Sequence, residues 1–102
     1  MTSITEHKVR MLNMAKRMTQ KDADFLGHML NNAEHYSINF GGRSEMMRIF
    51  DRFNWIVYLL VDTNRITVEG ADKLLDYRAG FERFCIHQYE SEFCSNDAQN
   101  MA

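Results

Sequence analysis

Histidine and cysteine are the residue types in this chain with the greatest capacity for metal chemistry, and it has 4 histidines and 2 cysteines. His28 and His35 are seven residues apart in a stretch with helical periodicity. On a helix they are about 10.5 Å apart along the axis, so one metal ion would need ligands from a second helix to bind both. Cys85 and His87 form a C-x-H pair, but the Glu-x-x-His pairs of a di-metal carboxylate bundle do not occur. We therefore expect no metal and no cofactor.

The usual arrangements for nucleophilic or acid–base catalysis are also missing from the sequence. There is no nucleophile elbow and no Ser, His and Asp set with local support. Carboxylates do not recur in inward-facing pairs at helical spacing, as general acid–base chemistry in a bundle would require. We therefore expect that the protein is not an enzyme.

The segment Phe40-Gly41-Gly42-Arg43-Ser44 is a candidate anion-binding site. A glycine pair that leads into a helix presents backbone amides at the positive end of the helix dipole, which suits phosphate or carboxylate. Arg43 adds a bidentate donor, and the Ser44 hydroxyl can cap the helix or contact the anion. The segment is not a Walker loop, because it has neither GxxxxGK nor a preceding strand. The alternative is a plain turn in which Ser44 is the N-cap.

The stretch 44–64 has an unbroken helical period, and its apolar residues fall on one broad face. We expect that face to be the core of a small bundle; it comprises Met46, Ile49, Phe50, Phe53, Ile56, Val57, Leu60 and Val61. The β-branched and aromatic residues of 55–61 and 66–68 would also suit a hairpin across 62–65. We prefer the helix because the period continues without a break from Met46.

Outside that apolar face the same helix carries Arg48, Arg52, Trp55 and Tyr58. Tryptophan, tyrosine and arginine dominate interface hot spots because they combine a large buried area with directional polar groups. We therefore predict that these four residues bind a protein partner. Two alternatives remain: Trp55 is covered by the first helix or by a second copy of the chain, and the arginines merely pair with acidic residues of their own helix.

Capping residues mark the starts of the other helices, and the absence of proline favours long helices. Ser3 and Glu6 form a capping box, Thr19 starts a second helix, and Thr67 starts a fourth that reaches about Phe93. The inward faces of the first two helices are expected to comprise Ile4, His7, Met11, Met14, Ala15, Met18, Ala23, Phe25, Leu26, Met29, Leu30, Ala33 and Tyr36.

Together these elements predict an all-α four-helix bundle with a long central hairpin made by the third and fourth helices. We expect one domain over residues 1–94 and a flexible C-terminal tail over residues 95–102, which has no apolar period.

The fourth helix has two apolar stripes instead of one. The first comprises Val68, Ala71, Leu75, Ala79, Ile86, Tyr89 and Phe93, and the second comprises Tyr77, Phe81 and Phe84. A four-helix monomer buries the second stripe only with difficulty, so we predict self-association through it as a two-fold dimer. Arg78 and Glu82, at i and i+4, are expected to form an ion pair.

Composition and charge exclude several other classes. With 45% apolar residues, 25% charged residues and a net charge of −2, the chain is neither disordered nor a polyanion-binding tail. Its apolar runs are too short for a membrane span or a signal peptide. Cys85 and Cys94 would lie about 13.5 Å apart along a helix, too far for a disulfide. We therefore expect a reduced, cytoplasmic setting.

Binding to DNA has only weak support. Residues 19–27 open like a helix-turn-helix, but the spacing to Gly27 is one residue short and no basic recognition helix follows. The bases of the first helix are spread around its circumference instead of lining up for phosphates.

The function we predict is a non-enzymatic protein-interaction module, a small regulator or inhibitor of the phage or mobile-element accessory type that docks on a larger macromolecule. One alternative is a small protein that binds or sequesters an anionic ligand such as a nucleotide through Gly41, Gly42, Arg43 and Ser44. The other is a DNA-binding regulator.

Overall fold

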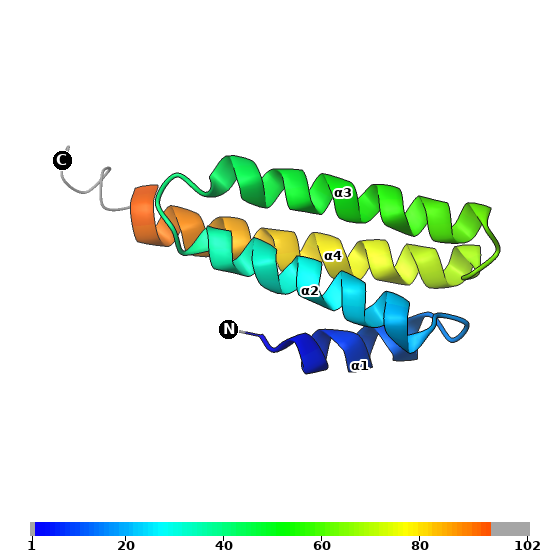
Figure 1. Cartoon of the computed structure of the whole chain (residues 1–102). Coiled ribbons are helices and arrows are strands. Elements are labelled where there is room, and N and C mark those ends of the chain that lie inside the picture. The colour runs from blue at the N-terminus through cyan, green and yellow to red at the C-terminus, as the bar shows by residue number, and fades with distance from the viewer. Residues whose placement is uncertain (1, 95–102) are drawn as a thin grey trace.

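The computed structural model describes residues 2–94, which form four α-helices and a final π-helical turn (Figure 1). The helices are α1 (Ile4–Met14), α2 (Gln20–Ser37), α3 (Arg43–Asp62) and α4 (Val68–Tyr89), and the π-helical turn η1 (Glu90–Cys94) continues α4. No strand occurs in this part of the chain. The all-α prediction is therefore confirmed and the hairpin alternative is wrong. The predicted tail over 95–102 lies outside the described residues.

Three of the helices begin at the caps that the sequence predicts. The side-chain oxygens of Ser3, Thr19 and Thr67 accept hydrogen bonds from backbone amides three residues later, at 3.1, 3.1 and 3.0 Å. Each bond satisfies an amide that has no partner within the helix, a contribution of about 1 kcal/mol.

The turn after α3 reverses the chain. Asn64 has a left-handed backbone with φ 59°. The amides of Asn64 and Arg65 donate to the carbonyls of Val61 and Leu60 at 2.9 and 2.8 Å, which is the double closure of a Schellman motif. As a result α4 runs back along α3, antiparallel to it (Figure 1).

The core lies where the helices face one another. α2 packs against the other three helices, and α4 also packs against each of the others. All six residues predicted to face inward from the first helix are buried or partly buried, although Ala15 and Met18 lie beyond the end of α1 at Met14. All eight predicted inward residues of α3 are also buried or partly buried. The buried apolar residues are Met11, Ala15, Met18, Ala23, Leu26, Met29, Leu30, Ala33, Met46, Phe50, Phe53, Val57, Leu60, Ile66, Ala71, Leu74, Cys85 and Tyr89.

Two residues predicted to face the core are exposed instead. Phe25 is 55% exposed because it lies one residue, or about 100°, from Leu26, on which the buried arc of α2 is centred. Val68 is 65% exposed because it lies about 100° around the helix from the centre of the buried side of α4, while Ile66 and Gly70 on either side of it are buried. The fully buried residues of α4 include Leu74 and Cys85, which the two-stripe analysis left out.

Arg78 fastens α4 to α3. Its Nη1 lies 2.8 Å from a carboxylate oxygen of Glu82, so the predicted pair is confirmed, and both side chains are largely buried. Its Nε donates to the backbone carbonyl of Phe50 at 3.2 Å, and its guanidinium carbon lies 5.4 Å from the centre of the Phe50 ring. Arg78 therefore links α4 to α3 through one hydrogen bond and one cation–π contact.

The second apolar stripe of α4 is covered in part by α1. His7 is fully buried, its Nδ1 lies 2.6 Å from the Tyr77 hydroxyl oxygen, and its ring meets Phe81 edge-on at 4.7 Å between centroids. Tyr77 and Phe81 are thus partly buried within the chain, whereas Phe84 is half exposed.

Among the described helices, none combines the length and apolarity needed to cross a membrane.

Burial of His7 makes stability depend on pH. Burial is the largest cause that lowers the pKa of His7 from 6.5 to about 4. The unfolded state binds a proton at His7 more tightly than the folded state does, so protonation favours unfolding. The protein is therefore most stable, with respect to His7, above pH 6.5. We expect the free energy of unfolding to fall by about 3 kcal/mol as the pH is lowered from 6.5 to 4.

Urea unfolding at several pH values measures this dependence. His7→Gln should remove that part of the slope, whereas His87→Gln, at an exposed position on α4, should keep it. An NMR titration of the His7 ring in the unsubstituted chain reads the pKa directly. A value near 6.5, or equal slopes in the wild type and His7→Gln, would contradict the assignment.

Candidate functional site

The rotation of α3 about its own axis decides which of its residues face solvent. Met46, Phe50, Phe53, Val57 and Leu60 are buried against α2 and α4. At about 100° per residue, the opposite side of the helix is centred on residue 55. The packing of the core therefore turns this side away from the other helices.

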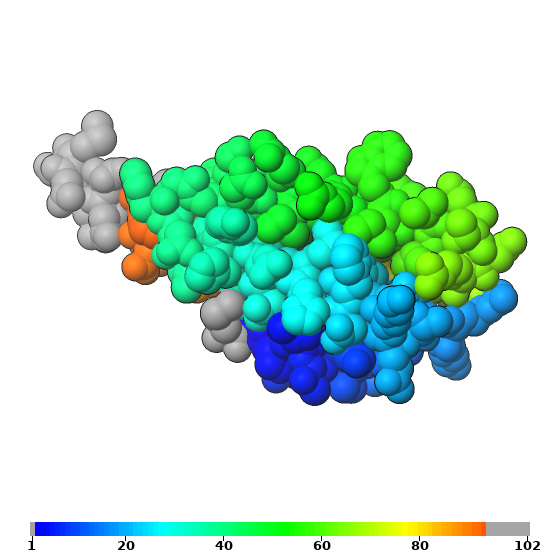
Figure 2. Space-filling view, viewed as in Figure 1, coloured from blue at the N-terminus to red at the C-terminus, as the bar shows by residue number. Residues whose placement is uncertain are grey.

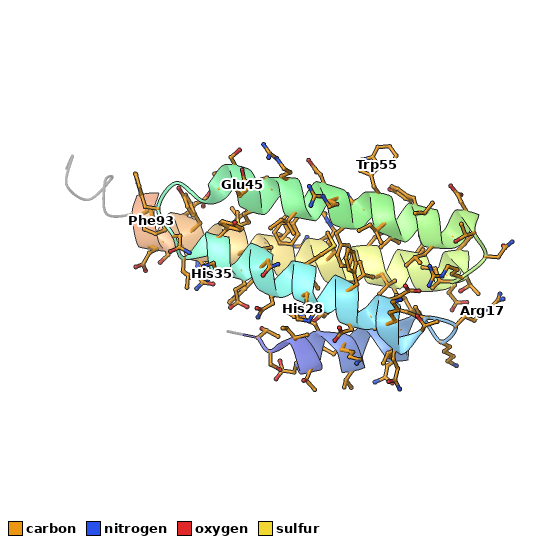
Figure 3. The ribbon with its side chains drawn as sticks, in the orientation of Figure 1. Arg17, His28, His35, Glu45, Trp55 and Phe93 are labelled. Carbon is orange, nitrogen blue, oxygen red and sulfur yellow. The ribbon has the colours of Figure 1, made fainter. Side chains whose placement is uncertain are left out.

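Trp55 is the most exposed of the large apolar residues on this outward side. Its side chain projects away from the bundle (Figure 3), and the residue is 73% exposed. The Tyr58 ring lies against it, edge-on, with 6.3 Å between centroids. Tyr58 and Leu59 are 50% and 59% exposed. Three large apolar side chains thus share one patch of surface, on a helix that is otherwise well packed.

The two predicted arginines lie N-terminal to this patch on the same side of α3. Arg48 and Arg52 are both exposed. Arg48 is 3.5 Å from a carboxylate oxygen of Glu45, one helical turn earlier. Exposed pairs of this kind hold an arginine only weakly, by about 0–1 kcal/mol. The structure therefore brings the four predicted partner-binding residues together on one exposed face, and neither α1 nor another described element covers Trp55. We call Arg48, Arg52, Trp55, Tyr58 and Leu59 the outer face of α3.

Leu59 belongs to this face, although sequence analysis did not place it among the binding residues. It follows Trp55 by one helical turn and lies outside the predicted apolar arc. Those two properties were the available signal. An exposed leucine adds about 1.5–3 kcal/mol to an interface that buries it fully.

A hollow between α2 and α3 adjoins the outer face at Arg52. Its volume is about 340 Å³, and its lining comprises Met29, Asn32, His35, Tyr36, Glu45, Ile49 and Arg52. On the face shown in Figure 2, α3 forms one long edge and α2 lies beside it. Arg52 therefore belongs both to this hollow and to the outer face of α3.

The segment over 41–44 already uses much of its hydrogen-bonding capacity inside the chain. The Gly41 amide donates to the Tyr89 hydroxyl at 3.3 Å, and the Gly42 amide donates to the Asn39 carbonyl at 2.9 Å. Arg43 lies 3.8 Å from a carboxylate oxygen of Glu90. Anion binding here stays a prediction, and it would have to compete with these contacts.

The predicted cap at the start of α3 is wrong. α3 begins at Arg43 with Gly42 as its N-cap, and no side chain caps it. Ser44 is already inside the helix. Glycine is needed at both preceding positions: Gly41 has φ 82°, and a Cβ on Gly42 would collide with the carbonyl oxygen of Tyr36. The tight return of the chain from α2 therefore sets this boundary, not a hydroxyl.

The predicted self-association residues line a groove between α1 and α4. The groove has a volume of about 310 Å³ and is lined by Thr2, Arg10, Asp76, Tyr77, Gly80, Phe81 and Phe84. Because His7 and Arg10 of α1 already contact Tyr77, the apolar surface left over is centred on Phe84. Self-association through these residues stays a prediction.

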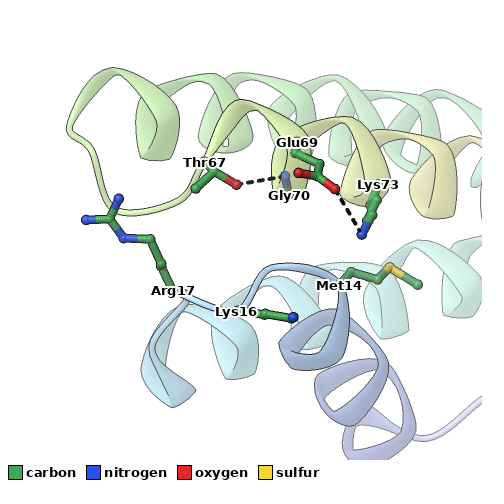
Figure 4. A pocket seen from close by; sticks show the side chains of 7 residues that line it. All are labelled: Met14, Lys16, Arg17, Thr67, Glu69, Gly70 and Lys73. Carbon is green, nitrogen blue, oxygen red and sulfur yellow. Dashed lines mark hydrogen bonds and ion pairs between the residues drawn. The ribbon is translucent and has the colours of Figure 1, made fainter.

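A third hollow lies where the α1–α2 turn meets the first turn of α4 (Figure 4). It has a volume of about 300 Å³ and is lined by Met14, Lys16, Arg17, Thr67, Glu69, Gly70 and Lys73. Lys73 lies 3.6 Å from a carboxylate oxygen of Glu69, so part of the positive charge is balanced locally. Lys16 and Arg17 are exposed surface residues on its edge.

The residues best suited to chemistry lie apart from these surfaces. Burial is the largest cause that raises the pKa of the Cys85 thiol to about 12, so it stays protonated and is a poor nucleophile. His7 is equally enclosed. His28 lies 3.7 Å from an Asp24 carboxylate oxygen on the surface of α2. Within residues 2–94 no three histidine, cysteine or acidic side chains gather as metal ligands. The predicted Cys85–Cys94 separation involves a side chain outside the described part.

Comparison of the chain with protein-family models, with curated proteins and with solved structures found no match.

The corrected start of α3 predicts the effects of two substitutions. Gly42→Ala should lower the free energy of unfolding by about 1–3 kcal/mol, because the added methyl group meets backbone atoms that cannot move aside. Ser44→Ala should change it by less than about 0.5 kcal/mol, since Ser44 caps nothing. Urea unfolding monitored by circular dichroism measures both. If Ser44→Ala lowered the free energy of unfolding as much as Gly42→Ala or more, the Ser44 hydroxyl would be the cap of α3 after all.

Proposed function

We propose that this chain is a non-enzymatic protein-interaction module that docks on a larger macromolecule through the outer face of α3. The single observation that carries the proposal is the exposure of Trp55, at 73%, on a helix whose opposite side is fully packed. Regulation or inhibition of that macromolecule is the role that we infer. We also infer that the protein is located in the cytoplasm, because free thiols such as that of Cys85 persist there.

The exposed side chains have a cost that binding would offset. A Trp, a Tyr and a Leu in one patch leave apolar area in water, at about 25 cal/mol for each Å². A single exposed apolar residue is ordinary, but a clustered set flanked by charges is typical of an interaction site. The same residue types give the largest losses when interfaces are scanned with alanine.

The chemistry of the face describes its partner. Trp55 and Leu59 would fill an apolar pocket on the macromolecule. Arg52 and Arg48, one and two turns before Trp55, would meet carboxylates on the edge of that pocket. The partner surface is therefore expected to be apolar at its centre and acidic on one side.

Binding measurements with Trp55→Ala test the proposal. We expect the tagged wild-type chain to capture a specific protein from its own cells, and Trp55→Ala to weaken that binding by at least 2 kcal/mol, roughly 30-fold. Because Trp55 is exposed, the substitution should leave thermal stability nearly unchanged.

Phe84→Ala is the matched control, since it removes a half-exposed aromatic ring from α4 instead of α3. It should bind as the wild type does. The proposal fails if no protein is captured, if Trp55→Ala captures it as well as the wild type does, or if both variants lose it equally.

A further inference from the structure

The outer face of α3 has the spacing of a helix–helix seam. Arg48, Arg52, Trp55, Leu59 and Asp62 follow one another at intervals of four, three, four and three residues, and all five are exposed. That alternation keeps residues on one side of a helix over several turns and is the pattern by which two helices pack lengthwise. The buried stripe of α3 lies on its other side, so this second seam is left over after the chain has folded.

The charges on this seam change sign along the helix. Its N-terminal part carries Arg48 and Arg52, its middle Trp55 and Leu59, and its end Asp62. Arg48 and Asp62 are each seven residues from Trp55, which places them about 10.5 Å to either side of it along the axis. A second α3 laid antiparallel across Trp55 would therefore set each arginine opposite the aspartate of the other copy.

The centre of the seam is occupied by aromatic side chains, because Trp55 lies midway between Arg48 and Asp62. The two indoles would meet at the two-fold axis, where an offset stack is available. A parallel pairing would instead set Arg48 against Arg48, with like charges in contact.

The position of Asp62 supports a partner from outside the chain. Asp62 is the last residue of α3, where the negative end of the helix dipole disfavours an acid. Within residues 2–94 neither Asp62 nor Arg52 has an ion-pair partner. An arginine supplied by a second copy would offset that unfavourable interaction.

We propose that the chain self-associates as an antiparallel two-fold dimer through α3, with Trp55 at its centre and Arg48 of each copy paired with Asp62 of the other. This inference rests on the proposed function in one respect, that the outer face of α3 is an interface. The second copy and the macromolecule cannot occupy the face together, because each would cover Trp55. A single helix face is small for a stable interface, so the dimer should dissociate on dilution.

A charge-swap experiment tests the dimer. Sedimentation velocity of the full chain over a concentration series should show monomers that convert to dimers. Arg48→Asp and Asp62→Arg should each weaken the dimer roughly tenfold or more, because either change turns two attractive pairs into repulsive ones. The double variant, Arg48→Asp with Asp62→Arg, should return to within about threefold of the wild type.

Matched controls separate this result from a net-charge effect and from unfolding. Arg83→Asp, at an exposed site on α4, makes the same charge change as Arg48→Asp and should leave the dimer intact. Circular dichroism should give the same melting curve for all variants. Three results would each overturn the inference. The wild type could be monomeric at every concentration, or the single charge reversals could leave dimer affinity unchanged. The third is a double variant that dimerises no more tightly than the single variants.

The two proposals fail in different ways. If the wild type is monomeric but its capture of a foreign protein needs Trp55, the dimer is excluded and the docking function stands. If the charge swap restores the dimer but no foreign protein is captured, the dimer stands and the docking function fails.

Discussion

The burial of Phe50, Phe53, Val57 and Leu60 is the constraint on which the rest of the structure depends, because it fixes the rotation of α3 about its axis. These side chains fill the space between α2 and α4, and each contributes about 1.5–3 kcal/mol when it is fully buried. Turning α3 by half a turn would bury Trp55 but would expose all four of them. Burying these four side chains stabilises the fold more than burying Trp55 would. The tryptophan is therefore left on the surface of α3.

α4 illustrates the opposite case, in which an apparent surplus of apolar residues is absorbed by the fold. Its second stripe begins with Tyr77 and Phe81, which α1 covers through a buried histidine that contacts both rings. Because α4 packs against three other helices, it buries a wider arc than a helix with one neighbour does. The large apolar side chains that remain exposed on α4 are Val68, in its first turn, and the half-exposed ring of Phe84, and the two are far apart along the helix. On α3, by contrast, three exposed apolar side chains adjoin one another, and charged residues lie at both ends of this patch.

The elements that could be predicted from the sequence are those set by local spacing. Hydroxyl caps mark three helix starts, and the period of α3 gives its buried face and hence its exposed one. Predictions failed where a distant contact decides the outcome. Ser44 resembles a cap in sequence, but α3 begins at Arg43 with Gly42 as its N-cap, because the chain passes close to the carbonyl of Tyr36 there. Phe25 resembles a core residue, but α2 is rotated to suit three neighbours at once. The helical period was enough to predict that the candidate site is exposed. It could not predict what binds there, because that depends on the surface of a second molecule.

The central claim is that the outer face of α3 is open in the free chain and covered when the chain is bound. Trp55 is the only tryptophan, so its fluorescence reports on that face alone. In dilute solution, where the proposed dimer should dissociate, the emission of Trp55 should resemble that of free tryptophan and acrylamide should quench it efficiently. Its emission should then shift to shorter wavelength and resist quenching as the chain is concentrated. A blue-shifted, protected indole in the dilute monomer would show that the fold itself covers Trp55 and would contradict this claim.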